Sequence, residues 1–158
     1  MLSEYAERSG NPPGQMVRGM ANSSSLLRGF LDLNRAMKRA HLDRAVSERI
    51  SLAVQLWIGC DYCIEAHTRA GRAAGLTDND IEIAKQGTAT DAKTAAIVAF
   101  GQQVIAAPSE VTDGDVQNLK ALGWRDEQIA DVVGLAALNL LTGGFNLIAG
   151  IHPAVTKA

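Results

Sequence analysis

The stretch that decides the fold runs from residue 48 to residue 67 and reads ERISLAVQLWIGCDYCIEAH. Together with the residues just before it, its first half repeats apolar side chains at helical spacing: Val46, Ile50, Ala53, Val54 and Trp57. A period of about 3.6 residues predicts an amphipathic helix with one face in a core. Gly59 then breaks the pattern, and a second helix is expected from about Cys60 to Ala74. Because the turn between them is short, we expect an antiparallel helix pair.

Helical spacing continues on both sides of this pair. Further helices are expected at about 26–39, 77–87, 90–107, 112–123 and 126–141, with a last short piece between Gly144 and Pro153. Thr112 and Asp115 have the spacing of a capping pair at one helix start. No segment alternates as a strand does, so the chain is predicted to be all-α, with a single helical domain over 23–158. Residues 1–22, rich in glycine and proline, are expected to form an irregular N-terminal arm that packs on a partner.

Composition narrows the class of protein. The chain has 158 residues, of which 47% are hydrophobic, enough for one domain with a sizeable core. Its net charge of −2 and the absence of a basic stripe argue against a nucleic-acid partner. The stretch 132–151 has no charged residue, but polar side chains interrupt it, so we expect a buried or subunit-interface helix with no membrane span. The N-terminal residues lack an apolar leader, which favours the cytoplasm.

The chemistry is expected at the two cysteines. On one helix, Cys60, Cys63 and His67 share a face, because they are three and then four residues apart. Cys60 lies at the helix start, where free N–H groups and the helix dipole favour a thiolate. His67 is one turn beyond Cys63 and is placed to accept its proton. Since the thiolate is the reactive form of cysteine, these residues predict a redox-active thiol site.

Glu48 is the fourth candidate catalytic residue. If the chain folds back at Gly59, Glu48 lies roughly 16 Å along one helix and His67 roughly 10 Å along the other, at about 1.5 Å per residue. Side-chain reach or a bridging water closes such an offset. Glu48 is then placed to orient His67 and to relay its proton.

The two cysteines have two other interpretations. They can be small buried apolar side chains, or they can bind zinc together with Glu48 and His67. Structural zinc sites usually draw ligands from separate loops, whereas three of these residues lie on one helix face, so no metal or other cofactor is expected. Trp57 and Tyr62 are the candidate pocket residues, although each can equally be core. His41 and His152 are expected on the surface, and Asn139 and Asn146 at helix ends or in an interface.

The motif resembles the signature of the alkylhydroperoxidase D-like (AhpD-like) branch of the carboxymuconolactone decarboxylase family. The resemblance rests on Glu48, eleven residues, Cys60-Asp61-Tyr62-Cys63, three residues and His67. It covers roughly residues 23–150, and the flanks also agree, at 42–48, 73–77, 91–93 and 123–129. What it implies is a helical fold assembled as a homotrimer or homohexamer, and reduction of peroxides or disulfides by the two cysteines.

By the same resemblance, Cys63 attacks a small hydroperoxide and becomes a sulfenic acid, and Cys60 resolves it to a disulfide. An external thiol or dithiol then resets the pair, while His67 and Glu48 match the family's proton-relay positions. The chain departs from the best-studied branch at Tyr62, where that branch has a histidine. Two alternatives remain: a lactone decarboxylase using His67 as acid and base, although true decarboxylases lack the cysteine pair, and a non-enzymatic redox or metal sensor.

Overall fold

The computed structural model describes residues 2, 6–7 and 10–153. Within these residues it contains eight numbered α-helices, one short 3-10 helix and no strand, which confirms the all-α prediction. The elements follow in the order α2 (Gln15–Met20), α3 (Ser24–Met37), α4 (Arg44–Ile58), α5 (Asp61–Ala73), α6 (Asp78–Lys85), α7 (Ala92–Ala106), η1 (Pro108–Glu110), α8 (Asp113–Ala121) and α9 (Asp126–Ile148).

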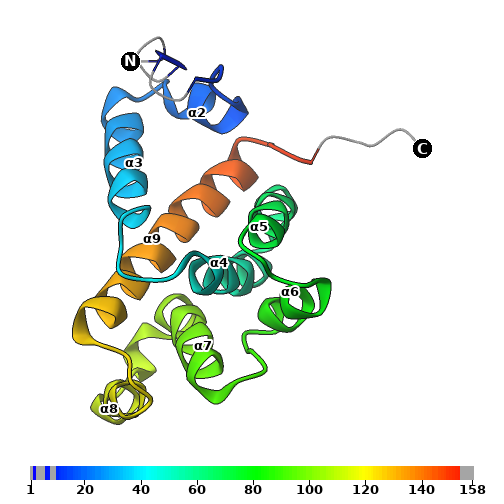
Figure 1. The fold of residues 1–158 in the computed structure, drawn as a ribbon. Coiled ribbons are helices and arrows are strands. Elements are labelled where there is room, and N and C mark those ends of the chain that lie inside the picture. The colour runs from blue at the N-terminus through cyan, green and yellow to red at the C-terminus, as the bar shows by residue number, and fades with distance from the viewer. Residues whose placement is uncertain (1, 3–5, 8–9, 154–158) are drawn as a thin grey trace.

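Two helices organise the fold. Helix α9 crosses the molecule diagonally, with α3 along one side and α4 and α5 along the other (Figure 1). Helix α4 packs against α5, α6, α7 and α9, so it has neighbours on nearly every side. It contributes to two apolar clusters, one shared with α7, α8 and α9 and one shared with α6. Since Glu48 is on α4, one end of the predicted site is fixed to the most enclosed helix.

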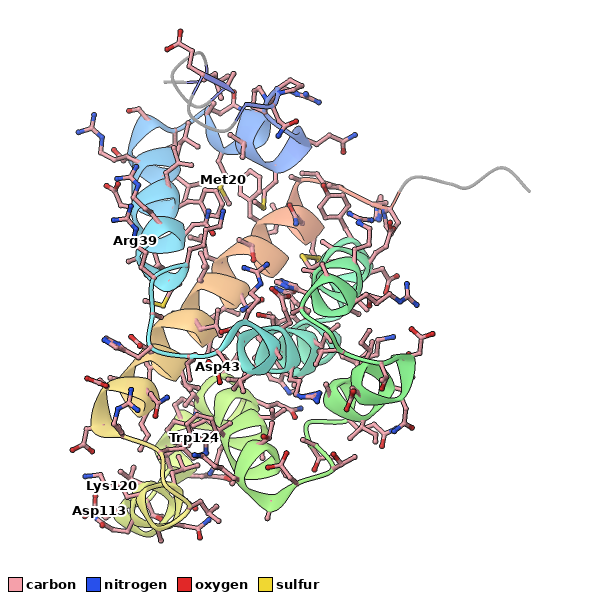
Figure 2. All side chains as sticks on the ribbon, in the orientation of Figure 1. Met20, Arg39, Asp43, Asp113, Lys120 and Trp124 are labelled. Atoms are coloured by element: carbon pink, nitrogen blue, oxygen red, sulfur yellow. A yellow bond between two sulfur atoms is a disulfide. The ribbon has the colours of Figure 1, made fainter. Side chains whose placement is uncertain are left out.

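The N-terminal segment differs from the expected irregular arm. Gln15–Met20 forms helix α2, directly after Pro12, Pro13 and Gly14, which mark only its start. Val17 and Met20 are buried in a cluster with α3 and α9 side chains, and Figure 2 places Met20 at this junction. The prolines and glycine therefore indicate an irregular segment where the chain in fact forms a helix, and this helix packs on α3 and α9 of the same chain. The remaining N-terminal positions, apart from 2, 6–7 and 10–14, lie outside the described residues.

Helix α9 is longer than the sequence indicated. The sequence predicts an end near Leu141 and a separate piece after Gly144, but the helix continues to Ile148. Glycine disfavours a helix interior by only about 1 kcal/mol, which packing offsets here. A Cβ on Gly143 would lie 2.5 Å from Gln55 Oε1, so glycine lets α9 approach α4 closely.

By length and hydropathy alone, α9 is the one helix among the described residues that would be long enough to cross a membrane. In this fold it packs against α3, α4 and α7, and it buries the polar side chains of Asn139 and Asn146. Those contacts are typical of a central helix in a helical domain.

Side-chain caps fix where helices begin. Thr77 and Asp80 form a reciprocal capping box at α6, and Thr112 and Asp115 form the capping pair that the sequence predicted at α8. Hydrogen bonds from the Thr77 hydroxyl and backbone N–H hold the pKa of Asp80 below its ordinary value of 3.8. Asp80 also accepts a hydrogen bond from Arg49 Nη2 at 2.9 Å, which ties α6 to α4.

Candidate active site

The turn between α4 and α5 brings both cysteines to one helix start. Gly59 ends α4 in the left-handed region, at φ 82°, a conformation that glycine adopts without strain. Cys60 then caps α5, and its sulfur accepts a hydrogen bond from the Cys63 N–H at 3.3 Å. The predicted break at Gly59 therefore sets the position of the thiol pair.

The sulfurs of Cys60 and Cys63 are joined as a disulfide in this structure, shown in yellow beside α5 in Figure 2. The two residues are not equally accessible. Cys63 is 5% exposed and lines a cavity, whereas Cys60 is 1% exposed and is not among the described residues that line it. Cys63 is thus the sulfur that faces the space available to a ligand.

Glu48 and His67 are in direct contact across the helix pair. His67 Nδ1 lies 2.7 Å from Glu48 Oε2, so no bridging water is needed. The other carboxylate oxygen, Oε1, lies 2.7 Å from Arg44 Nη2. Glu48 is buried, and a buried carboxylate is costly unless it is paired. Contacts on both oxygens fix its orientation and hold the imidazole of His67.

The cavity has a volume of about 490 Å³ and lies between α3, α4, α5 and α9. One side carries the predicted chemistry, formed by Glu48, Tyr62, Cys63 and His67. The rest of the lining mixes apolar with polar side chains: Phe30, Met37, Leu42, Leu135 and Leu138 with Asn34, Ser51, Asn139 and Thr142. A volume in this range and a mixed lining are typical of a site for a small molecule.

The two candidate pocket residues, Trp57 and Tyr62, differ in their position relative to the cavity. Tyr62 lines the cavity, whereas Trp57 is not among its described lining residues and is 49% exposed. The reason is helical phase: Trp57 follows Glu48 by nine residues, about two and a half turns at 3.6 residues per turn, so the two face opposite ways. The assignment of Trp57 to a pocket wall is therefore corrected.

Sequence reasoning missed one direct partner of the thiol site. Asn146, on α9, donates a hydrogen bond from Nδ2 to Cys63 Sγ at 3.2 Å. From the sequence, this polar residue in an uncharged stretch is expected at a helix end or in an interface. Only the packing of α9 on α5 reveals the contact, because 83 residues separate the two side chains.

A buried polar network lies two turns earlier on α9. Asn139 donates to Ser51 Oγ at 3.0 Å and accepts a hydrogen bond from Gln55 Nε2 at 2.9 Å. The network joins α9 to α4 beside the cavity. Two buried oxygens in the described part of the chain, Gln55 Oε1 and Asn146 Oδ1, have no hydrogen-bond donor.

Metal binding by these residues was an alternative from the sequence. Throughout residues 2, 6–7 and 10–153, no three His, Cys, Asp or Glu side chains are grouped so as to hold a metal ion. Glu48 and His67 contact each other, and the cysteines are paired with each other. The site as arranged is suited to proton transfer next to a sulfur.

Comparison with known proteins identifies the class. The family model described as "Carboxymuconolactone decarboxylase family" matches residues 25–104, and the chain belongs to that family. Its helical architecture is the AhpD-like fold. No curated protein matches the sequence.

Solved structures share the fold at low identity. A peroxidase-related protein from Silicibacter sp. TM1040 is 19% identical with a TM-score of 0.82, covering 98% of this chain and 83% of the other. A protein from Ralstonia eutropha JMP134, described as an alkylhydroperoxidase AhpD core, is 22% identical with the same TM-score and coverage. An Agrobacterium tumefaciens protein of unknown function, linked by its description to AhpD and antioxidant defence, is 17% identical with a TM-score of 0.67, covering 85% of this chain and 94% of the other.

Proposed function

We propose that this protein is a thiol-dependent peroxidase that reduces small hydroperoxides through the Cys60–Cys63 pair, as part of antioxidant defence. One observation carries the proposal: the Cys63 sulfur lines the same cavity as the Glu48–His67 pair, while Cys60 is bonded to it from outside that cavity. An attacking thiol, a proton carrier and a resolving thiol are therefore adjacent. The peroxidase-related descriptions of its structural relatives are consistent with this assignment.

In the first step, His67 accepts the thiol proton of Cys63, and the thiolate attacks the outer oxygen of the hydroperoxide. The S–O bond forms as the O–O bond breaks. The leaving alkoxide takes the proton back from His67 and departs as an alcohol, while Cys63 becomes a sulfenic acid. Glu48 stabilises the protonated imidazole through its contact with Nδ1.

In the second step, the Cys60 sulfur attacks Cys63 Sγ. The S–S bond forms, the S–O bond breaks, and hydroxide leaves as water with the Cys60 proton. The cysteines lose two electrons and the hydroperoxide gains two. An external thiol or dithiol then reduces the disulfide by exchange and becomes a disulfide itself. The cycle needs no metal or organic cofactor, and the requirement for a thiol reductant fits the cytoplasm.

We also propose that the protein works as a homotrimer or homohexamer. Helix α9 leaves Val133, Leu140 and Leu147 exposed, each seven residues after the last, and Ile148 follows at its end. A seven-residue repeat of exposed apolar side chains is typical of a helix that packs on another helix. A second copy of the chain would cover this stripe.

The deciding experiment counts free thiols and measures intact mass before and after a small excess of cumene hydroperoxide. We expect the reduced protein to lose both thiols and two hydrogens. Cys60→Ser should instead accumulate a sulfenic acid, detectable with dimedone, and Cys63→Ser should not react. If both wild-type thiols survive, the peroxidase proposal is wrong, and lactone acids become the substrates to test.

A further inference from the structure

We propose that Asn146 acts together with Cys60 and Cys63: its amide N–H donates a hydrogen bond to Cys63 Sγ and stabilises the reactive thiolate. The identification of Cys63 as the reacting sulfur rests on the proposed function. The contact itself does not, because Nδ2 lies 3.2 Å from Cys63 Sγ in the disulfide form of the structure, and the proposal extends that contact to the reduced sulfur.

The surroundings make this donor effective. Asn146 is 1% exposed and Cys63 is 5% exposed, so little water competes for the sulfur. A hydrogen bond to a charged acceptor is stronger where the local dielectric is low. The recorded hydrogen bond from the first turn of α5 goes to Cys60 Sγ, so the amide on α9 is the donor that reaches the Cys63 sulfur.

Asn146 is held by a rigid helix. It lies in the last turn of α9, where its backbone oxygen accepts a hydrogen bond from the Ile151 N–H at 2.9 Å. One turn earlier, Gly143 allows close packing of α9 on α4. A donor on a packed helix keeps its geometry while the sulfur changes its bonding partner.

The two ends of the Asn146 amide differ in their partners. Asn146 Oδ1 is buried and has no hydrogen-bond donor among the described residues. Asn139, on the same face of α9, has both ends of its amide bonded. Within the described residues, Nδ2 is therefore the end of the Asn146 amide that has a partner, and that partner is the Cys63 sulfur.

Other charged or titratable groups face the same cavity and must be separated from Asn146 in a test. They come from the end of α3 and the following loop, from α4 and from α5: Lys38, Asp43, Arg44, Glu48, Tyr62 and His67. Helix α9 contributes no titratable side chain to the described lining. A substitution at 146 therefore leaves all of these groups in place.

The test measures the pH midpoint of thiolate formation, by ultraviolet absorbance and by the rate of iodoacetamide alkylation. Cys60→Ser serves as the parent, so that Cys63 is the only thiol. Asn146→Leu should raise the midpoint by about one to two pH units, the usual strength of a hydrogen bond to a charged group. Asn146→Asp should raise it further, because a carboxylate opposes the thiolate.

Thr142→Val is the matched control. Thr142 lies one turn before Asn146 and lines the cavity, but its hydroxyl bonds to Asn139 and Gln55. Its midpoint should equal that of the parent. If Asn146→Leu fails to fold, Asn146→Ala is measured in its place.

An unchanged midpoint in a folded 146 variant would overturn the proposal, even if the wild type reduces hydroperoxides. A raised midpoint in a protein that never consumes hydroperoxide would leave Asn146 assigned and the peroxidase proposal wrong. A raised midpoint in Thr142→Val as well would also count against Asn146, because the effect would then be general to α9.

Discussion

The carboxylate of Glu48 and the imidazole of His67 lie 2.7 Å apart, on two antiparallel helices joined at Gly59. Nineteen residues separate them in the chain. The hydrogen bond orients the imidazole, and Arg44 holds the far side of the carboxylate. This relationship gives the first prediction about activity.

Glu48→Gln should lower kcat/KM for a hydroperoxide by about tenfold or more, and His67→Asn by about 10²-fold, because proton transfer by a positioned side chain contributes on that scale. Glutamine keeps the shape of Glu48 but not the charge that stabilises protonated His67. The measurement is hydroperoxide consumption with a dithiol reductant across a pH series. Equal loss in a matched exposed variant such as Glu82→Gln would contradict the assigned role.

Asp80→Asn should destabilise the protein at neutral pH by about 0.5–1 kcal/mol, as expected for a helix cap with a partly exposed ion pair. Hydrogen bonds from Thr77 lower the pKa of Asp80 in the folded state. Its contribution is therefore present above the ordinary value of 3.8 and is lost as pH falls through the lower folded pKa. Urea unfolding at neutral pH and well below 3.8 checks this. A difference of the same size at both values would show that the carboxylate charge is not the cause.

Gly101→Ala should lower the free energy of unfolding by about 1–3 kcal/mol, the usual range for overpacking. A Cβ on Gly101, in α7, would lie 2.6 Å from Ile50 Cγ2 on α4. Gly29 is the matched control, since it is exposed on α3 and a Cβ there meets nothing within 4 Å in the described structure. Gly29→Ala should stabilise the protein by about 0.5–1 kcal/mol. Thermal or urea unfolding of both variants measures these changes in the free energy of unfolding. A stabilised Gly101→Ala would show that α4 and α7 pack less tightly than described.

Leu140→Glu should reduce the assembly to smaller species, because it places a charge in the exposed apolar stripe of α9. Light scattering coupled to size-exclusion chromatography measures the mass. Gln117→Glu, at an exposed position on α8, is the control and should leave the mass unchanged. If the wild-type protein has the mass of a monomer in this measurement, the proposal of a homo-oligomer is wrong.

The sequence predicted the helix pair because its two signals are local. Helical period identifies α4, and Gly59 marks the turn. The contact between Glu48 and His67 followed from counting residues along the two helices. The error at Trp57 was avoidable by the same counting, since nine residues place it opposite Glu48.

Other features depend on tertiary packing and could not be predicted locally. Gly143 and Gly144 indicated a helix end, but the close approach of α9 to α4 favours continuation. Pro12 and Pro13 indicated an irregular segment, but buried Val17 and Met20 stabilise a helix just after them. Asn146 was visible as a polar residue in an apolar stretch, yet nothing local pairs it with Cys63.

The disulfide lies within a single helix start, and both of its cysteines belong to the same turn. A bridge between residues three apart restricts the unfolded chain less than one that joins distant segments. Its cleavage also separates no helix from another, because α4 and α9 are held to their neighbours by apolar side chains and by the amides of Gln55 and Asn139. The oxidised and reduced proteins should therefore share one architecture, so that forming or breaking this bond leaves the helical scaffold unchanged.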